Sequence, residues 1–179
     1  MACAFALPFA SASFAEDPAV LHIRKEYQSI QSALPRLKAE PLELSGYSTE
    51  GGEAKAFRDN MGNIPLIAVQ LYGESGKVFE EFYYENGALI FAFYKQYHYN
   101  VPSYISQELA KEMGGEAFDP QKSTITEDRY YFNNGKMIKW LDEQEIPVQA
   151  ESTEFKDTEK DVLEAANEML SKFKEKPNE

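Results

Sequence analysis

Residues 64–100 read IPLIAVQLYGESGKVFEEFYYENGALIFAFYKQYHYN, and this stretch decides the fold. Apolar and aromatic side chains recur in three runs, which Gly73-Glu74-Ser75-Gly76 and Asn86-Gly87 separate. Strand-length runs with short turns between them are typical of antiparallel pairing. Asn-Gly suits a two-residue type I′ turn, because both central residues of that turn need positive φ. We therefore predict three consecutive antiparallel strands.

The same pattern extends to both sides of this stretch. Residues 42–47 and 53–58 precede it as two shorter strands, and residues 127–132 and 136–141 follow as a hairpin that turns at Asn134-Gly135. Connections of about two to five residues are too short for parallel crossovers. The expected sheet is an antiparallel meander of about seven strands.

Two amphipathic helices flank the predicted sheet. Asp17-Pro18 is a typical helix start, and apolar residues then recur at three- and four-residue steps as far as Leu34. A capping-box-like sequence at Thr158 opens a second apolar stripe, and residues 103–113 form a short inserted helix. Because each stripe needs a partner, we predict an α+β fold with the N- and C-terminal helices packed on one face of the sheet.

Length and charge limit the classes of function. A chain of 179 residues fits one domain. Its net charge of −12 argues against a nucleic-acid partner, because binding phosphates requires clustered Lys and Arg. The acidic balance indicates solubility or a basic partner.

Residues 1–15, MACAFALPFASASFA, resemble a secretory signal peptide with a small-x-small cleavage site at its end. The run lacks a basic start, so a later-than-true first residue or a plain flexible N-terminus stays open. Export predicts a periplasmic or secreted domain at residues 16–179. Cleavage would remove Cys3, the one cysteine, which excludes disulfides and a Cys nucleophile, while lipidation at Cys3 depends on where the chain starts. No segment reaches the ~20 apolar residues of a membrane-spanning helix.

One hairpin design occurs twice. Residues 82–90, FYYENGALI, and residues 130–138, YYFNNGKMI, share an aromatic triplet, an Asn-Gly turn and an apolar exit. The pattern is similar to the YxNGK units of MORN-type and related bacterial repeat proteins. Two copies do not make a regular array, so the likeness indicates shared hairpin chemistry.

A longer resemblance covers most of the chain. The segments IRKEYQSI (23–30), LYGESGKVFEEFYYENGALIFAFYKQ (71–96) and EDRYYFNNGKMIKWLDEQ (127–144) occur in this order before a C-terminal helix. This arrangement resembles a group of uncharacterised exported bacterial proteins. The resemblance implies export and an α+β fold, and it implies no site.

The sequence offers few groups for catalysis. His22 lies one residue off the apolar stripe of the first helix, where a solvated side chain is expected, and His98 lies at a polar strand end. Glu80 and Glu81 are adjacent on a strand and therefore point to opposite faces. Residues 59–63, DNMGN, lack the alternating acids of a calcium loop and indicate a turn. Without nucleophile, phosphate-loop or His-Glu-x-x-His motifs, we predict no catalytic residue, metal or cofactor.

The aromatic residues suggest binding instead. They fall on both faces of the central strands, so a face that the helices leave open would present tyrosines to a protein or small ligand. A curved sheet or residues 101–124 would otherwise cover that face. The predicted binding residues lie near the end of the aromatic stretch and are Tyr94, Tyr97, His98, Tyr104 and Trp140.

Two other functions stay open at this point. One is a hydrolase or isomerase with a pocket between helix and sheet, using His98 and a buried Glu. The other is an inhibitor of an envelope enzyme, acting through a protruding acidic loop such as residues 114–124. The sequence decides neither the ligand nor the oligomeric state.

Overall fold

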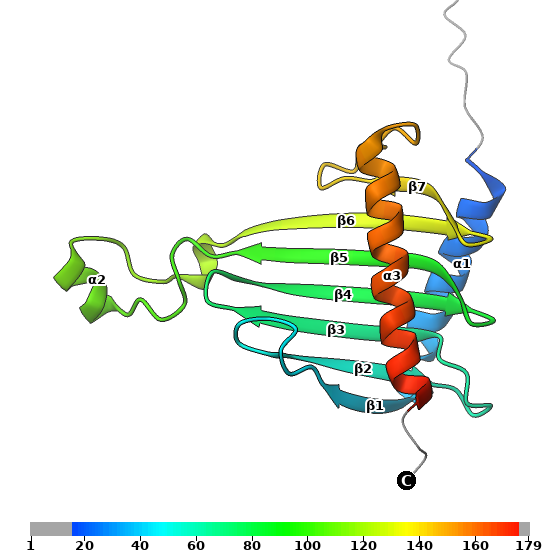
Figure 1. Cartoon of the computed structure of the whole chain (residues 1–179), viewed down its shortest axis with the longest axis horizontal. Helices are drawn as coiled ribbons and strands as arrows, with labels where there is room; N and C mark the ends of the chain where they lie inside the picture. Colours follow the sequence, from blue (N-terminus) through cyan, green and yellow to red (C-terminus); the bar gives the residue numbers. More distant parts are fainter. Residues whose placement is uncertain (1–15, 176–179) are drawn as a thin grey trace, which may run out of the picture.

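The computed structural model describes residues 16–175, in which a seven-stranded sheet carries one long helix on each face (Figure 1). The helices are α1 (Pro18–Ala33), α2 (Gln107–Met113) and α3 (Thr153–Glu175), with 3-10 turns η1 (Leu34–Arg36) and η2 (Pro120–Lys122). The strands are β1 (Lys38–Glu43), β2 (Gly52–Arg58), β3 (Leu66–Gly73), β4 (Gly76–Glu85), β5 (Ala88–His98), β6 (Thr124–Asn133) and β7 (Lys136–Leu141). The predicted signal peptide lies outside the described residues.

The sheet is the predicted antiparallel meander. Its strands lie in sequence order from β1 to β7, and every neighbouring pair is antiparallel. Asn86 and Asn134 have φ of 52°, and the glycines that follow them have φ of 78° and 74°. Positive φ at both central residues is what a type I′ turn requires. The α+β class, the strand number and the two Asn-Gly hairpins are thus confirmed.

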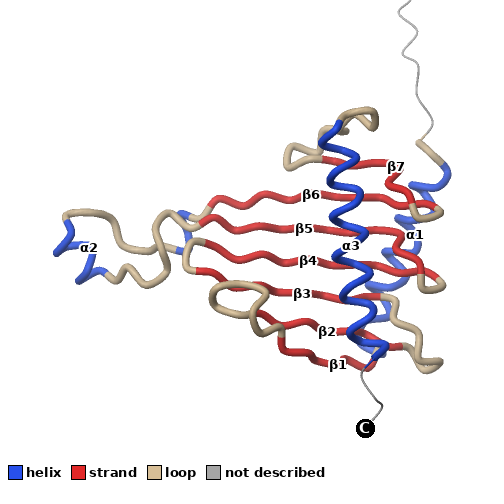
Figure 2. The backbone as a smooth tube through the Cα atoms, in the orientation of Figure 1, coloured by secondary structure: helices blue, strands red, loops and turns tan. Residues whose placement is uncertain are grey.

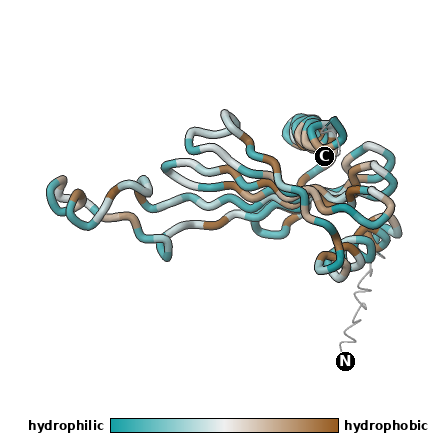
Figure 3. Tube along the Cα trace, turned by 90° about the horizontal axis from the view of Figure 1, so that it is seen from below, coloured by the Kyte–Doolittle hydropathy of each residue, from teal (hydrophilic) through white to brown (hydrophobic). Residues whose placement is uncertain are grey.

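The two long helices lie on opposite faces, whereas the sequence analysis placed both on one face. Figure 3 shows α3 and α1 on either side of the sheet. Phe82 and Tyr84 of β4 pack with α3, while Tyr83 between them packs with α1. The prediction was wrong because both faces of β4 and β5 are apolar at this level, and one stripe can cover only one of them.

Each long helix is fixed by a cap and an apolar stripe. The Asp17 carboxylate accepts a hydrogen bond from the Ala19 N–H (2.8 Å), and Val20 and Ile23 are buried against the sheet. α3 begins at Thr153, about one turn before the predicted start at Thr158, because the Ser152 hydroxyl accepts a hydrogen bond from the Phe155 N–H (3.1 Å). None of the helices in residues 16–175 is both long and apolar enough to cross a membrane.

β1 also begins earlier than predicted, at Lys38 and not at residue 42. Pro41 lies within the strand and pairs with Lys55 of β2. Proline is compatible with a strand at the edge of a sheet, where its missing N–H interrupts no ladder on the outer side. The predicted connector before residue 42 is therefore strand.

The central strands extend well past both helices, as Figure 2 shows. Residues 99–123, which include α2, continue beyond this end of the sheet (Figure 1). Asn100 holds the segment, since its amide donates to the Ala117 carbonyl (3.0 Å) and its side-chain oxygen accepts from the Asp119 N–H (3.0 Å). Residues 101–124 therefore do not cover a face of the sheet, and each face is covered over only part of its length.

Candidate ligand-binding surface

Two of the five predicted binding residues belong to the core between the sheet and α3. Trp140 is buried, and its indole N–H donates to Asp128 (2.8 Å). Tyr94 is partly buried, with its ring against Phe82 and Tyr130. Burial raises the Tyr94 pKa above its usual value, and the nearby Glu80 carboxyl raises it further. These rings mainly stabilise the packing of α3.

The other three predicted residues do not join them. Tyr97 lies on the opposite face, with its ring against Phe79. His98 is exposed at the end of β5 and makes no hydrogen bond to a carboxylate within residues 16–175. Tyr104 is 59% exposed in the segment beyond the sheet. The five residues thus form no single site, and the geometry of His98 gives no support to a hydrolase or isomerase that uses it.

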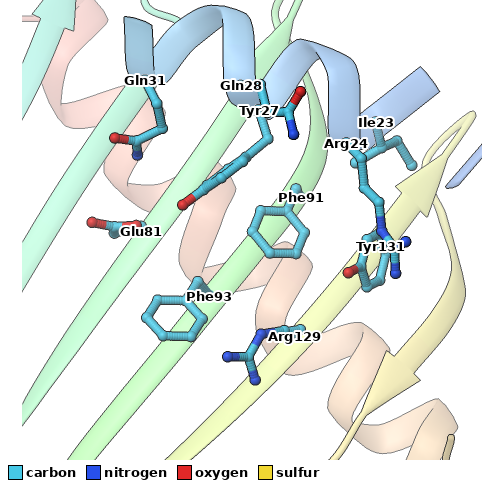
Figure 4. Close-up of a pocket in the computed structure, with 10 residues that line it drawn as sticks. All are labelled: Ile23, Arg24, Tyr27, Gln28, Gln31, Glu81, Phe91, Phe93, Arg129 and Tyr131. Atoms are coloured by element: carbon cyan, nitrogen blue, oxygen red, sulfur yellow. The ribbon is translucent and has the colours of Figure 1, made fainter. Parts of the chain in front are cut away.

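A cleft of about 510 Å³ lies instead between α1 and the sheet (Figure 4). The helix contributes one wall, which includes Arg24, Tyr27 and Gln31. Strands β4 to β6 contribute the floor, which includes Phe93 and Arg129. α1 covers only the end of the central strands, and the cleft opens where the helix wall meets the bare sheet.

A chain of hydrogen bonds fixes one side of this cleft. The Gln31 amide donates to the Tyr83 hydroxyl (2.6 Å), and that hydroxyl donates to the Glu81 carboxylate (2.6 Å). Burial raises the pKa of Tyr83 above its usual value, and the Glu81 carboxylate raises it further, so the hydroxyl stays protonated. Glu81 is therefore held as a hydrogen-bond acceptor at the edge of the cleft.

The two arginines of the cleft lie over aromatic rings. The Arg129 guanidinium is 5.3 Å from the centre of the Phe93 ring and donates to Glu127 (2.8 Å). The Arg24 guanidinium is 6.0 Å from the centre of the Tyr131 ring and donates to Glu16 (2.9 Å). A guanidinium has five N–H donors, so each arginine keeps donors for a further acceptor.

Cations continue over rings along the bare part of the same face. The Lys77 ammonium lies 5.2 Å from the Phe79 ring centre and 4.8 Å from that of Tyr97. Lys95 lies 5.6 Å from the Tyr97 ring centre and forms an ion pair with Glu127 (2.9 Å). We name this surface the cation-aromatic band. Its members are Arg24, Lys77, Phe79, Phe93, Lys95, Tyr97, Arg129 and Tyr131.

The opposite face has the reverse character. Glu80 has no ion pair or hydrogen bond within the described residues, and burial raises its pKa to about 7. Its cross-strand neighbours are Tyr94 and then Asp128, so no cation lies in this row. The cations of the central strands are thus concentrated on the α1 face.

No match was found when the chain was compared with models of protein families, curated proteins and solved structures. The resemblance to uncharacterised exported proteins therefore stays a prediction. The described cleft residues include no Ser, Cys or His, so the cleft supplies cations, aromatic rings and one carboxylate but no common nucleophile.

The sequence analysis missed Arg24, Glu81 and Arg129 as site residues. Its signal for them was weak but present: strand alternation places Glu81 on the same face as Tyr83, and Arg129 on the same face as Tyr131. What it lacked was the register between β5 and β6, which sets Phe93 opposite Arg129.

Proposed function

We propose that this protein binds a ligand without catalysis, at the cleft between α1 and the sheet. The ligand class is a small molecule or a peptide side chain that joins an anionic group to an aromatic or apolar body. The observation that carries the proposal is the pair of arginines over aromatic rings, Arg24 over Tyr131 and Arg129 over Phe93, facing one cleft.

Charge supports an anionic ligand. The chain carries −12 overall, so plain solubility does not account for the gathering of its strand cations on one face. A guanidinium stacked on a ring loses water from one side and presents its edge, where it donates in a planar fork that matches a carboxylate. The aromatic floor beside it suits an apolar body.

Glu81 adds a direction to the cleft. Figure 4 shows Glu81 below Gln31, on the side of the cleft away from Arg24. A carboxylate there repels a second anionic group and accepts a hydrogen bond from a donor. The best-fitting ligand therefore carries its anionic group near the arginines and a neutral donor or a cation toward Glu81.

The test compares carboxylates with their neutral amides. Benzoate, phenylacetate and indole-3-acetate are titrated against the protein beside the matching amides, with ligand-detected NMR as the readout. We expect the acids to bind at least tenfold more tightly than the amides, and Arg129→Met to remove this preference. Arg36→Met is the control, because Arg36 is exposed and does not line the cleft. Equal binding of acids and amides, or no effect of a folded Arg129→Met, contradicts the proposal.

The inhibitor function has one observation in its favour. Residues 99–123 project beyond the sheet, with Tyr104 59% and Met113 68% exposed. An inhibitor that uses this segment loses its target when Tyr104→Ser and Met113→Ser are combined, and keeps it in Met61→Ser, since Met61 is 84% exposed in another loop. Affinity capture from a periplasmic extract compares the two variants, and capture that both retain contradicts a role for the segment.

Export is part of the same proposal. Cell fractionation of the full chain is expected to recover a mature protein from the periplasm or the medium, shortened by about 15 residues. Mass spectrometry of that protein gives the new N-terminus. Recovery of the uncleaved chain from the cytoplasm contradicts this expectation.

A further inference from the structure

A second group of polar side chains lies outside the cleft, near the start of α1. His22 and Glu26 are one turn apart on the helix, and Glu85 is the last residue of β4. One ligand atom from each of the three residues lies within 4.8 Å of the other two. The His22 Nε2 atom and a Glu85 carboxylate oxygen are already 2.9 Å apart. Segments 63 residues apart in the chain thus bring an imidazole and two carboxylates together.

The backbone that carries these side chains is held in place. The four-residue spacing puts His22 and Glu26 on one side of the helix, and the neighbouring Ile23 is buried against the sheet. Glu85 directly precedes the Asn86-Gly87 turn, whose geometry is fixed by positive φ. Rotation of three side chains is therefore enough to bring the donor atoms to the ~2.0–2.2 Å at which imidazole nitrogen and carboxylate oxygen bind Zn²⁺.

The charge of the group is not balanced within the described residues. Glu26 makes no hydrogen bond or ion pair there, and Glu85 pairs only with His22. Two carboxylates beside a neutral imidazole carry two negative charges, which a divalent cation would neutralise. The imidazole distinguishes this group from an ordinary acidic patch, because nitrogen ligands favour zinc and its neighbours in the first transition series over Ca²⁺ and Mg²⁺.

Space for a further ligand lies beside the group. A cavity of about 540 Å³ is lined by His22, Glu85 and the two turn residues Asn86 and Asn134, among others. Three protein ligands with an open fourth position are the arrangement of zinc sites that keep a water or a ligand atom.

We propose that His22, Glu26 and Glu85 bind one divalent transition-metal ion, for which Zn²⁺ is the best fit, and that the ion joins α1 to the β4–β5 hairpin. The site is separate from the cleft and does not depend on the ligand proposed there. Its structural consequence is a tighter junction between the first helix and the sheet.

The test is calorimetric titration of the metal-free full chain with ZnCl₂, with Cys3→Ser in every sample so that the thiol cannot bind the ion. We expect one ion per chain and a rise in the thermal unfolding midpoint that EDTA reverses. Ca²⁺ and Mg²⁺ at the same concentration are expected to give neither effect. The absence of saturable Zn²⁺ binding overturns the proposal, as does equal binding of Ca²⁺.

Variants separate an ion site from a simple helix-to-sheet ion pair. Glu26→Gln leaves the hydrogen bond between His22 and Glu85 intact, yet it is expected to weaken Zn²⁺ binding at least tenfold, as is His22→Ala. His98→Ala and Glu164→Gln are the matched controls, because both residues are exposed and lie outside the group. If Glu26→Gln and His22→Ala bind Zn²⁺ as the parent chain does, the ion lies elsewhere and the assignment is wrong.

Discussion

The two faces of the sheet differ most clearly in two neighbouring rows of side chains. On the α3 face the row across β4, β5 and β6 is Glu80, Tyr94 and Asp128, two acids around a tyrosine. On the α1 face the next row is Glu81, Phe93 and Arg129, an acid, a ring and a base. A shift of one residue along each strand therefore separates a core with an unpaired acid from a surface whose charges have partners.

The difference shows how one sheet serves two purposes. α3 has 23 residues and buries six of them, so its face is chiefly the hydrophobic core. α1 has 16 residues and buries three, and more of its face remains open for cations and rings. The α3 face is expected to carry more of the stability and the α1 face more of the binding. Three substitutions test this division, and they follow in order of decreasing effect.

The largest effect is expected for Phe82→Ala on the α3 face. Phe82 is fully buried, and removal of its ring leaves a cavity that costs about 3–5 kcal/mol of unfolding free energy. Urea denaturation measures the change. Leu21→Ala, at a side chain that is 44% exposed on α1, is the control and is expected to change the free energy by less than about 0.5 kcal/mol. Similar losses in both variants would show that the α3 face is not the main core.

Glu80→Gln is expected to stabilise the protein, and only at high pH. Burial raises the Glu80 pKa from 4.5 to about 7, so the folded chain holds this proton more tightly than the unfolded chain does. The carboxyl therefore lowers stability as pH rises from 4.5 to 7, and the loss is complete above 7. Removal of the charge is expected to add about 2 kcal/mol at pH 8.5 and nothing at pH 4.

Urea denaturation at the two pH values measures the Glu80→Gln effect. Glu81→Gln, one residue along the same strand, is the matched control. It weakens the acceptor of the Tyr83 hydroxyl and is expected to give no gain in stability at either pH. A gain in Glu80→Gln that is the same at pH 4 and pH 8.5 would contradict burial of an ionisable carboxyl.

The smallest effect is expected for Tyr83→Phe on the α1 face. The change removes the hydroxyl that joins Gln31 to Glu81, and a net loss of about 1 kcal/mol follows from two hydrogen bonds that water can partly replace. Tyr131→Phe is the control, because the Tyr131 hydroxyl makes no hydrogen bond within the described residues. Equal losses in the two variants would mean that the chain of hydrogen bonds does not stabilise the cleft.

The sequence predicted local features of the fold well and the candidate site poorly. Asn86-Gly87 and Asn134-Gly135 fixed two hairpins, because the residues that need positive φ are adjacent in the chain. Trp140 and Tyr94 were expected at a binding surface, and the structure places them beneath α3. Alternation alone cannot say which face of a strand a distant helix covers when both faces carry aromatic rings.

The sequence by itself determined the antiparallel meander, the two amphipathic helices and their order, since these depend on contacts between residues close in the chain. Only the tertiary structure decided that the helices lie on opposite faces, and that Arg129 meets Phe93 across a connection of 25 residues, 99–123. The physical reason is that strand register and helix placement are set by packing over the whole sheet, which no short stretch of sequence contains.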